Sequence, residues 1–133
     1  MTANQDLRPA SAWGAIGALS AGIAVLAEAV GAHALRGMLE PDMLEVFQLA
    51  ARYQMLHALG LLATAWAIDR GGHPAVQRAA WLFIAGTIFF SGGLYAEAFA
   101  AQHMLGMTAP LGGLCFIAGW LSLAWGLWRR RPS

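Results

Sequence analysis

Four long apolar stretches, separated by short polar segments, account for most of the chain. They cover residues 13–35, about 43–68, about 79–101 and about 111–128. The first stretch has 23 residues and would extend about 34 Å as a helix, which is enough for the ~30 Å hydrocarbon core of a bilayer. The pattern predicts an all-α fold, an integral membrane bundle of four transmembrane helices forming one domain over residues 13–128.

The second stretch differs from the others because its first part is amphipathic. Glu45, Gln48 and Arg52 share one helical face, whereas Leu44 and Phe47 share another. This spacing predicts an interfacial first part of the second helix, which lies at the membrane surface before the helix crosses.

The distribution of arginine predicts the orientation. With four crossings, both termini and the 69–78 connection share one side, which holds six of the eight basic residues against two on the other. Cytoplasmic loops are enriched in Arg and Lys, so the N and C termini are predicted to be cytoplasmic. Residues 1–12 then form a polar N-terminal segment and residues 129–133 a basic C-terminal tail. Five tryptophans fall near the same side, where indole rings favour the headgroup level: Trp13, Trp66, Trp81, Trp125 and Trp128.

Composition agrees with a membrane protein. Hydrophobic residues make up 59% of the chain and charged residues only 11%, whereas soluble domains carry about 25% charged residues. A formal net charge of +1 provides no basic surface that would attract nucleic acid. The expected partners of such an apolar chain are membrane lipids. The single cysteine, Cys115, excludes an internal disulfide.

Polar side chains inside the apolar stretches are the candidate functional residues, because polar groups are costly in a bilayer. Nearly all of them fall in the outer halves of the predicted helices, which predicts a polar cluster on the periplasmic side. The candidate residues are His33, Arg52, Tyr53, Gln54, His57, Ser91, Tyr95 and Thr108, with Glu28, Glu97 and His103 as secondary candidates.

Several interpretations of this cluster remain open. Its charged members could pair with one another and hold the helices together, or they could form a proton or cation site. No ligand spacing such as His-x-x-x-His is present, so neither a metal site nor a cofactor is predicted. No nucleophile motif or glycine-rich phosphate loop is present either, so we predict no catalytic residues and no enzyme.

Two spacings predict helix contacts. Tyr53 and His57 are four residues apart, which suits a structural contact with the first helix. Ala18 with Gly22, and Cys115 with Gly119, are pairs of small residues that predict close helix packing.

Short motifs along the chain resemble those of a known family. They are Gly31-Ala32-His33-Ala34-Leu35, Arg52-Tyr53-Gln54 with His57, Phe90-Ser91-Gly92 with Leu94-Tyr95, Thr108 with Pro110, Gly112 and Gly113, and Gly119-Trp120. In this order the chain resembles the small four-helix inner-membrane proteins of bacteria catalogued as domain of unknown function 423. The resemblance implies a multi-pass protein of the bacterial inner membrane and no established catalytic residue.

The chain departs from that family's pattern at both intramembrane glutamates. Glu28 stands where the pattern has a small residue, usually glycine, and Glu97 stands where it has an apolar one. The two acids could form a local pair that shares a proton. A function shared by the family would then rest on His33, Arg52 and His57 rather than on either glutamate.

Two functions from different classes follow. The first is a structural or accessory membrane protein that binds lipid or a partner through its periplasmic polar cluster. The second is an oligomeric transporter or channel component for protons, a metal ion or a small solute. Four helices rarely enclose a pathway alone, so the second function requires a homo-oligomer or a partner membrane protein. The sequence specifies neither a substrate nor a physiological role.

Overall fold

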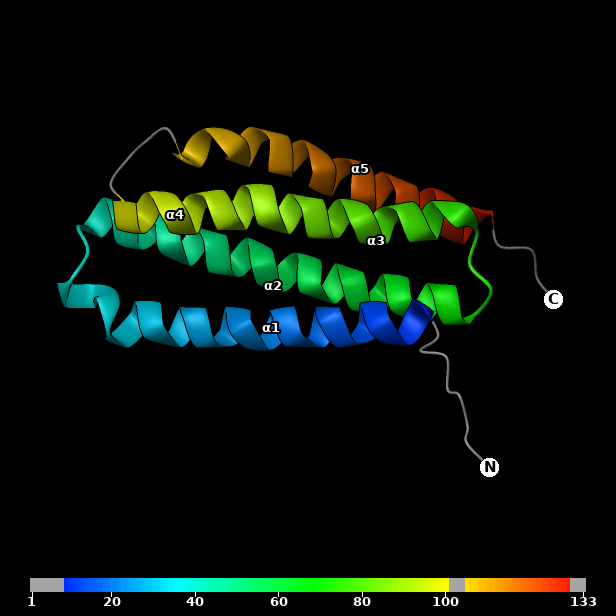
Figure 1. Cartoon of the computed structure of the whole chain (residues 1–133), viewed down its shortest axis with the longest axis horizontal. Coiled ribbons are helices and arrows are strands. Elements are labelled where there is room, and N and C mark those ends of the chain that lie inside the picture. Colours follow the sequence, from blue (N-terminus) through cyan, green and yellow to red (C-terminus); the bar gives the residue numbers. More distant parts are fainter. Residues whose placement is uncertain (1–8, 101–104, 130–133) are drawn as a thin grey trace, which may run out of the picture.

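The computed structural model describes residues 9–100 and 105–129, and every regular element within them is helical. The elements in order are α1 (Pro9–His33), η1 (Leu35–Gly37), α2 (Pro41–Asp69), α3 (Pro74–Gly86), the π-helix η2 (Thr87–Gly92), α4 (Gly93–Ala100), η3 (Leu105–Thr108) and α5 (Ala109–Trp128). Since α3, η2 and α4 follow one another without a break, the chain forms four long helical segments, and α1 begins at the end of the molecule where α5 ends (Figure 1). The all-α prediction is confirmed.

Prolines set where the helical segments begin. Pro41, Pro74 and Pro110 lie in the first turns of α2, α3 and α5, and α1 begins at Pro9. Proline suits a first turn because its φ is already helical and the missing N–H would have no partner there. The first and third helices therefore begin at residues 9 and 74, upstream of the expected residues 13 and 79.

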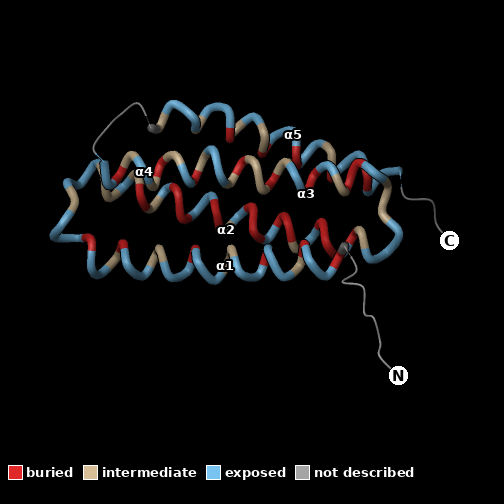
Figure 2. Tube along the Cα trace, viewed as in Figure 1, coloured by how far each residue is buried: buried red, intermediate tan, exposed pale blue. Residues whose placement is uncertain are grey.

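Helix α2 is the centre of the molecule. It contacts α1 on one side and α3, α4 and α5 on the other, whereas α5 contacts mainly α3 and η2. Figure 2 shows buried positions along most of α2, from Phe47 to Ala67, whereas α1 is largely exposed away from it. The core therefore lies along α2, and the four helical segments do not contribute equally to it.

Three segments are long and apolar enough to cross a membrane. They are Ala10–His33, Pro74–Ala100 and Gly106–Trp128. Helix α2 has 29 residues but is less apolar, because it carries more polar side chains, of which Gln54, His57 and Thr64 are buried. The chain is therefore a helical membrane protein with at least these three candidate spans in the described residues.

Small residues every seven positions carry the helix contacts. Gly112, Gly119 and Gly126 are buried on α5, where a Cβ at Gly112 would overlap the backbone of Phe90 and one at Gly119 would lie 2.8 Å from the ring of Phe83. The spacing gives α5 a flat face, which allows close approach to α3 and η2.

Helix α1 has a similar buried row at Ala10, Gly17, Ala24 and Gly31. Its contact with α2 uses this row, where a Cβ at Gly17 would lie 3.1 Å from the Ala58 carbonyl oxygen. The prediction of close packing at Ala18 and Gly22 is wrong, because both are exposed and no atom lies within 4 Å of a Cβ built at Gly22.

Candidate functional site

Gln54 is the hub of a hydrogen-bond network that joins three helices. Its Nε2 donates to the Ser20 carbonyl oxygen at 3.1 Å and to Ser20 Oγ at 3.3 Å, which connects α2 to α1. The Tyr95 hydroxyl, on α4, donates to Gln54 Oε1 at 2.8 Å. The amide thus has partners for both of its polar atoms, as a buried amide requires.

Two further hydroxyls hold the π-helix η2 in place. Ser91 is buried and its Oγ donates to the Ala50 carbonyl oxygen of α2 at 2.8 Å. Thr108 Oγ1 donates to the Phe89 carbonyl oxygen at 2.7 Å, which connects the start of α5 to η2. A π segment has wider turns than an α-helix, and these two bonds fix it to its neighbours on both sides.

His57 lies among aromatic rings. Its imidazole stacks on Phe116, with ring centroids 3.4 Å apart and planes within 5° of parallel, and Nδ1 donates to the Tyr53 carbonyl oxygen at 2.7 Å. Tyr53 stacks on Phe90 of η2 at 4.5 Å. Both rings therefore face η2 and α5. The predicted contact of Tyr53 and His57 with the first helix is wrong, because α1 packs on the face of α2 that carries Gln54.

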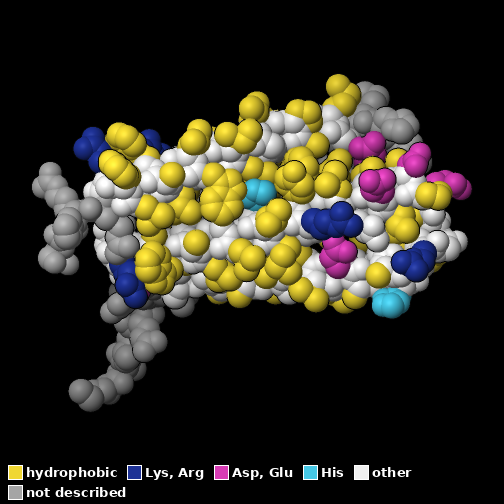
Figure 3. Space-filling model, turned by 180° about the vertical axis from the view of Figure 1, so that it is seen from behind, with side chains coloured by type: hydrophobic (Ala, Val, Ile, Leu, Met, Phe, Trp, Pro, Cys, Tyr) yellow, Lys and Arg dark blue, Asp and Glu magenta, His cyan; other side chains and the backbone are white. Residues whose placement is uncertain are grey.

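Glu28 and Arg52 form an ion pair on the surface between α1 and α2. Arg52 Nε lies 3.5 Å from Glu28 Oε1, and the two side chains are 62% and 38% exposed. They line an open groove of about 480 Å³ together with Val25, Met55 and Leu56. Figure 3 shows acidic side chains gathered toward one end of this face, basic ones toward both ends, and an acidic and a basic group adjacent among hydrophobic side chains.

The remaining candidates lie apart from this pair. The Glu97 carboxylate packs against Gly106, where a Cβ would overlap it, whereas the ion-pair partner of Glu28 is Arg52. The two glutamates are therefore not a pair with each other. His33 is exposed in the last turn of α1, whereas His57 is buried, and His103 lies outside the described residues. Within 9–100 and 105–129, no group of three or more His, Cys, Asp or Glu side chains could hold a metal ion.

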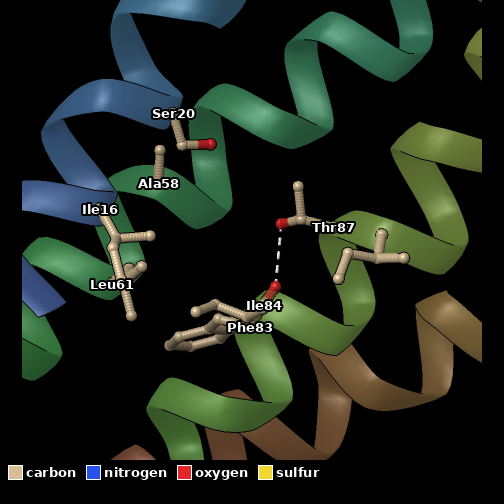
Figure 4. A pocket seen from close by; sticks show the side chains of 8 residues that line it. Ile16, Ser20, Ala58, Leu61, Phe83, Ile84 and Thr87 are labelled. Atoms are coloured by element: carbon tan, nitrogen blue, oxygen red, sulfur yellow. Dashed lines mark hydrogen bonds between the residues drawn. The ribbon is translucent and has the colours of Figure 1, made fainter.

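A second, smaller recess lies between α1 and α3 over α2 (Figure 4). Its volume is about 120 Å³, and its lining residues are Ile16, Ser20, Ala58, Leu61, Phe83, Ile84, Thr87 and Ile88. Both of its hydroxyls already have partners, since Thr87 Oγ1 donates to the Phe83 carbonyl oxygen at 2.8 Å and Ser20 Oγ accepts from Gln54. The recess therefore offers an almost wholly apolar surface.

The sequence did not identify every residue that builds these sites. Ser20 was missed, although a hydroxyl in the middle of an apolar helix is a signal that it bonds to another helix. Phe83, Phe116 and Trp120 were also missed. Their rings surround His57, but aromatic residues in an apolar run give no signal that separates them from lipid-facing ones.

These features define a small helical membrane protein in which Gln54, Ser91 and Tyr95, polar side chains within apolar helices, bond to neighbouring helices. The chain belongs to the family described as Protein of unknown function (DUF423), whose model matches residues 27–113.

Bacterial relatives support this membership. The chain is 39% identical over 109 residues to the UPF0382 membrane protein YwdK of Bacillus subtilis, covering 81% of this chain and 89% of that protein. It is 43% identical over 108 residues to a UPF0382 membrane protein of Staphylococcus haemolyticus (81% and 88% covered). It is 36% identical over 115 residues to one of Haemophilus influenzae (86% and 91% covered). No solved structure matches.

Proposed function

We propose that the chain is a non-enzymatic structural or accessory protein of the bacterial inner membrane, which binds lipid or a partner membrane protein on its periplasmic side. In this proposal the chain crosses the membrane four times and both termini are cytoplasmic. The bacterial relatives named as membrane proteins support the location.

The central place of α2 supports the fourth crossing. Helix α2 lies between α1 and the α3–α4 segment and packs along both of them. If these neighbours cross, α2 crosses with them, and its buried polar side chains, Gln54, His57 and Thr64, do not face lipid because the neighbours cover them. The distribution of arginine supports the orientation. Arg70, Arg78 and Arg129 lie at the end where α1 begins, which is the end proposed to be cytoplasmic.

The observation that carries the function is how the polar cluster is used. Gln54, Tyr95 and Ser91 bond to neighbouring helices, and His57 is enclosed by rings. Arg52 differs, because 62% of its side chain is exposed on the outer surface of the bundle. A bundle fixed from within, with one exposed cation beside an open groove, suits attachment to lipid or to another helix.

Native mass spectrometry of the protein released from mild detergent tests this function. We expect a protein that retains a phospholipid or a co-purified membrane protein, and we expect Arg52→Gln to reduce that retention. A homo-oligomer that holds a stoichiometric metal ion would contradict the proposal and favour the transporter or channel component instead.

Cysteine labelling tests the orientation. In a Cys115→Ala background, single cysteines are introduced as Met38→Cys, in the α1–α2 connection, and as Arg129→Cys, after α5. Both positions are exposed. We expect a membrane-impermeant maleimide to label Met38→Cys in intact spheroplasts and to label Arg129→Cys only after lysis. Labelling of both, or of Arg129→Cys alone, would contradict cytoplasmic termini.

A further inference from the structure

The α1–α2 groove combines two opposite charges with an apolar floor. Its polar end is the Glu28–Arg52 pair, and Val25, Met55 and Leu56 form the rest of its lining. Its volume of about 480 Å³ falls within the range of small-molecule sites, which is roughly 300–1,000 Å³. The groove is therefore large enough for part of a lipid.

Both charged groups have unused hydrogen-bonding capacity. The contact between them joins Arg52 Nε to Glu28 Oε1, and the Arg52 Nη groups have no hydrogen-bond partner among the residues that the structure describes. Glu28 Oε1 faces Arg52 and is buried without a hydrogen bond to that part of the chain, whereas 38% of the Glu28 side chain is exposed, so an incoming donor would approach the carboxylate from its open side. A guanidinium offers a fork of donors that suits phosphate, whereas a carboxylate only accepts.

The depth of the pair suits a lipid headgroup. Arg52 lies 14 residues before Trp66 on α2, and Glu28 lies 15 residues after Trp13 on α1, so both lie about 21–23 Å along their helices from the tryptophan-rich end. If that end is at one headgroup level, the pair lies roughly 8 Å inside the opposite edge of a ~30 Å hydrocarbon core. A long arginine side chain can extend over that distance toward the phosphates.

We infer that this groove binds a zwitterionic aminophospholipid, whose phosphate and primary ammonium are joined by a two-carbon link. The phosphate accepts from the Arg52 Nη groups, the ammonium donates to the Glu28 carboxylate, and one acyl chain lies along Val25, Met55 and Leu56. The opposite charges of this headgroup match the two charges of the groove. An anionic headgroup without an amine would leave Glu28 without a donor and would be repelled by it.

This inference rests on the proposed lipid-binding function, and the experiment separates the two. The intact protein is incubated in mild detergent with equal amounts of phosphatidylethanolamine, phosphatidylcholine and phosphatidylglycerol of the same acyl chains, and native mass spectrometry measures retention. We expect about tenfold preference for phosphatidylethanolamine, because the quaternary amine of phosphatidylcholine cannot donate a hydrogen bond and phosphatidylglycerol has no amine.

Three variants locate the binding. Glu28→Gln should remove the preference while retaining phospholipid, and Arg52→Gln should lower retention of every phospholipid. Leu56→Trp should lower retention by filling the groove. The matched controls are Glu45→Gln, Arg36→Gln and Leu59→Trp, which change exposed residues outside the groove lining and should leave retention unchanged.

Two outcomes would overturn the inference in distinguishable ways. Equal retention of the three lipids that is lost in Arg52→Gln would refute the aminophospholipid while leaving lipid binding in place. No retention of any lipid by the wild-type protein, or equal effects of the controls and the groove variants, would refute lipid binding at this groove altogether. Melting in detergent, measured for each variant, excludes loss of fold as the cause.

Discussion

The two outer helices pack against their neighbours through similar rows of small residues, yet the two interfaces are built differently. On α5, Gly112, Gly119 and Gly126 lie against bulky side chains and backbone of α3 and η2. On α1, the buried row alternates alanine and glycine, and the interface adds the Gln54–Ser20 hydrogen bonds and the Glu28–Arg52 pair. The α5 interface relies mainly on shape, with the Thr108 hydrogen bond at its start, whereas the α1 interface adds polar bonds along its length.

The difference illustrates two ways of joining helices in lipid. Because lipid tails are as apolar as leucine, burial alone does not drive helices together. The α5 interface is stabilised instead by close van der Waals contact, which a single added methyl group would disrupt. The α1 interface is less tight at its glycines, where an added Cβ would meet its nearest atom at 3.1 Å (Gly17) and 3.2 Å (Gly31), and hydrogen bonds of modest value supplement it. We therefore expect a few large effects at α5 and several small ones at α1.

The largest expected effect is at α5. Gly112→Leu would place a side chain where Phe90 lies, which should cost about 3 kcal/mol or more because neither backbone can move apart without opening the interface. The measurement is thermal unfolding in detergent. The matched control is Gly113→Leu, because no atom lies within 4 Å of a Cβ at that position. Equal destabilisation by the two variants would show that the close contact at Gly112 is not responsible, since leucine favours the helix more than glycine at both positions.

A smaller effect is expected where α4 is bonded to α2. Tyr95→Phe removes the hydroxyl that donates to Gln54 Oε1 and should cost about 1 kcal/mol, the usual size of such a bond within a membrane. Tyr53→Phe is the control, since the Tyr53 hydroxyl donates no hydrogen bond within the described part of the chain. If both substitutions lower the melting temperature equally, the hydrogen bond from the Tyr95 hydroxyl to Gln54 does not contribute to the stability of the protein.

The smallest effect is expected at the exposed ion pair. Arg52→Gln should change the free energy of unfolding in detergent by less than about 1 kcal/mol, because the pair makes a single 3.5 Å contact and both side chains are partly exposed toward the headgroup level, where such pairs contribute little. Arg36→Gln, an exposed arginine in η1, is the reference. A loss larger than that of Tyr95→Phe would mean that the pair holds α1 to α2, and the two interfaces would then differ more than the structure indicates.

Much of the fold could be predicted because it depends on pattern. The apolar runs give the helices, and the arginines suggest the orientation. Gln54, Ser91 and Tyr95 were also identified as members of a cluster, because polar groups in apolar helices stand out. These signals are local, and each can be recognised without knowing which helices are neighbours.

The partners of these residues could not be predicted, because they depend on how each helix is rotated. Gln54 and His57 are three residues apart on α2, yet one bonds to Ser20 of α1 and the other stacks on Phe116 of α5. Since α2 lies between its neighbours, a small angular difference decides which of them a side chain contacts. The same uncertainty led to the wrong expectation that His57 faces the first helix.

The π-helix Thr87–Gly92 has a consequence for how the length of this chain can vary over evolution. An α-helix turns about 100° per residue, so deleting one residue inside α3 would turn Tyr95 away from Gln54, although no residue that forms the bond had been replaced. A π turn closes with i→i+5 hydrogen bonds and holds one residue more than an α turn. Deleting one residue within 87–92 would therefore be absorbed by conversion of the π turn into an α turn, with Tyr95 still facing Gln54. We expect single-residue deletions to be tolerated in 87–92 and in the connection at 70–73, and to be excluded from α3.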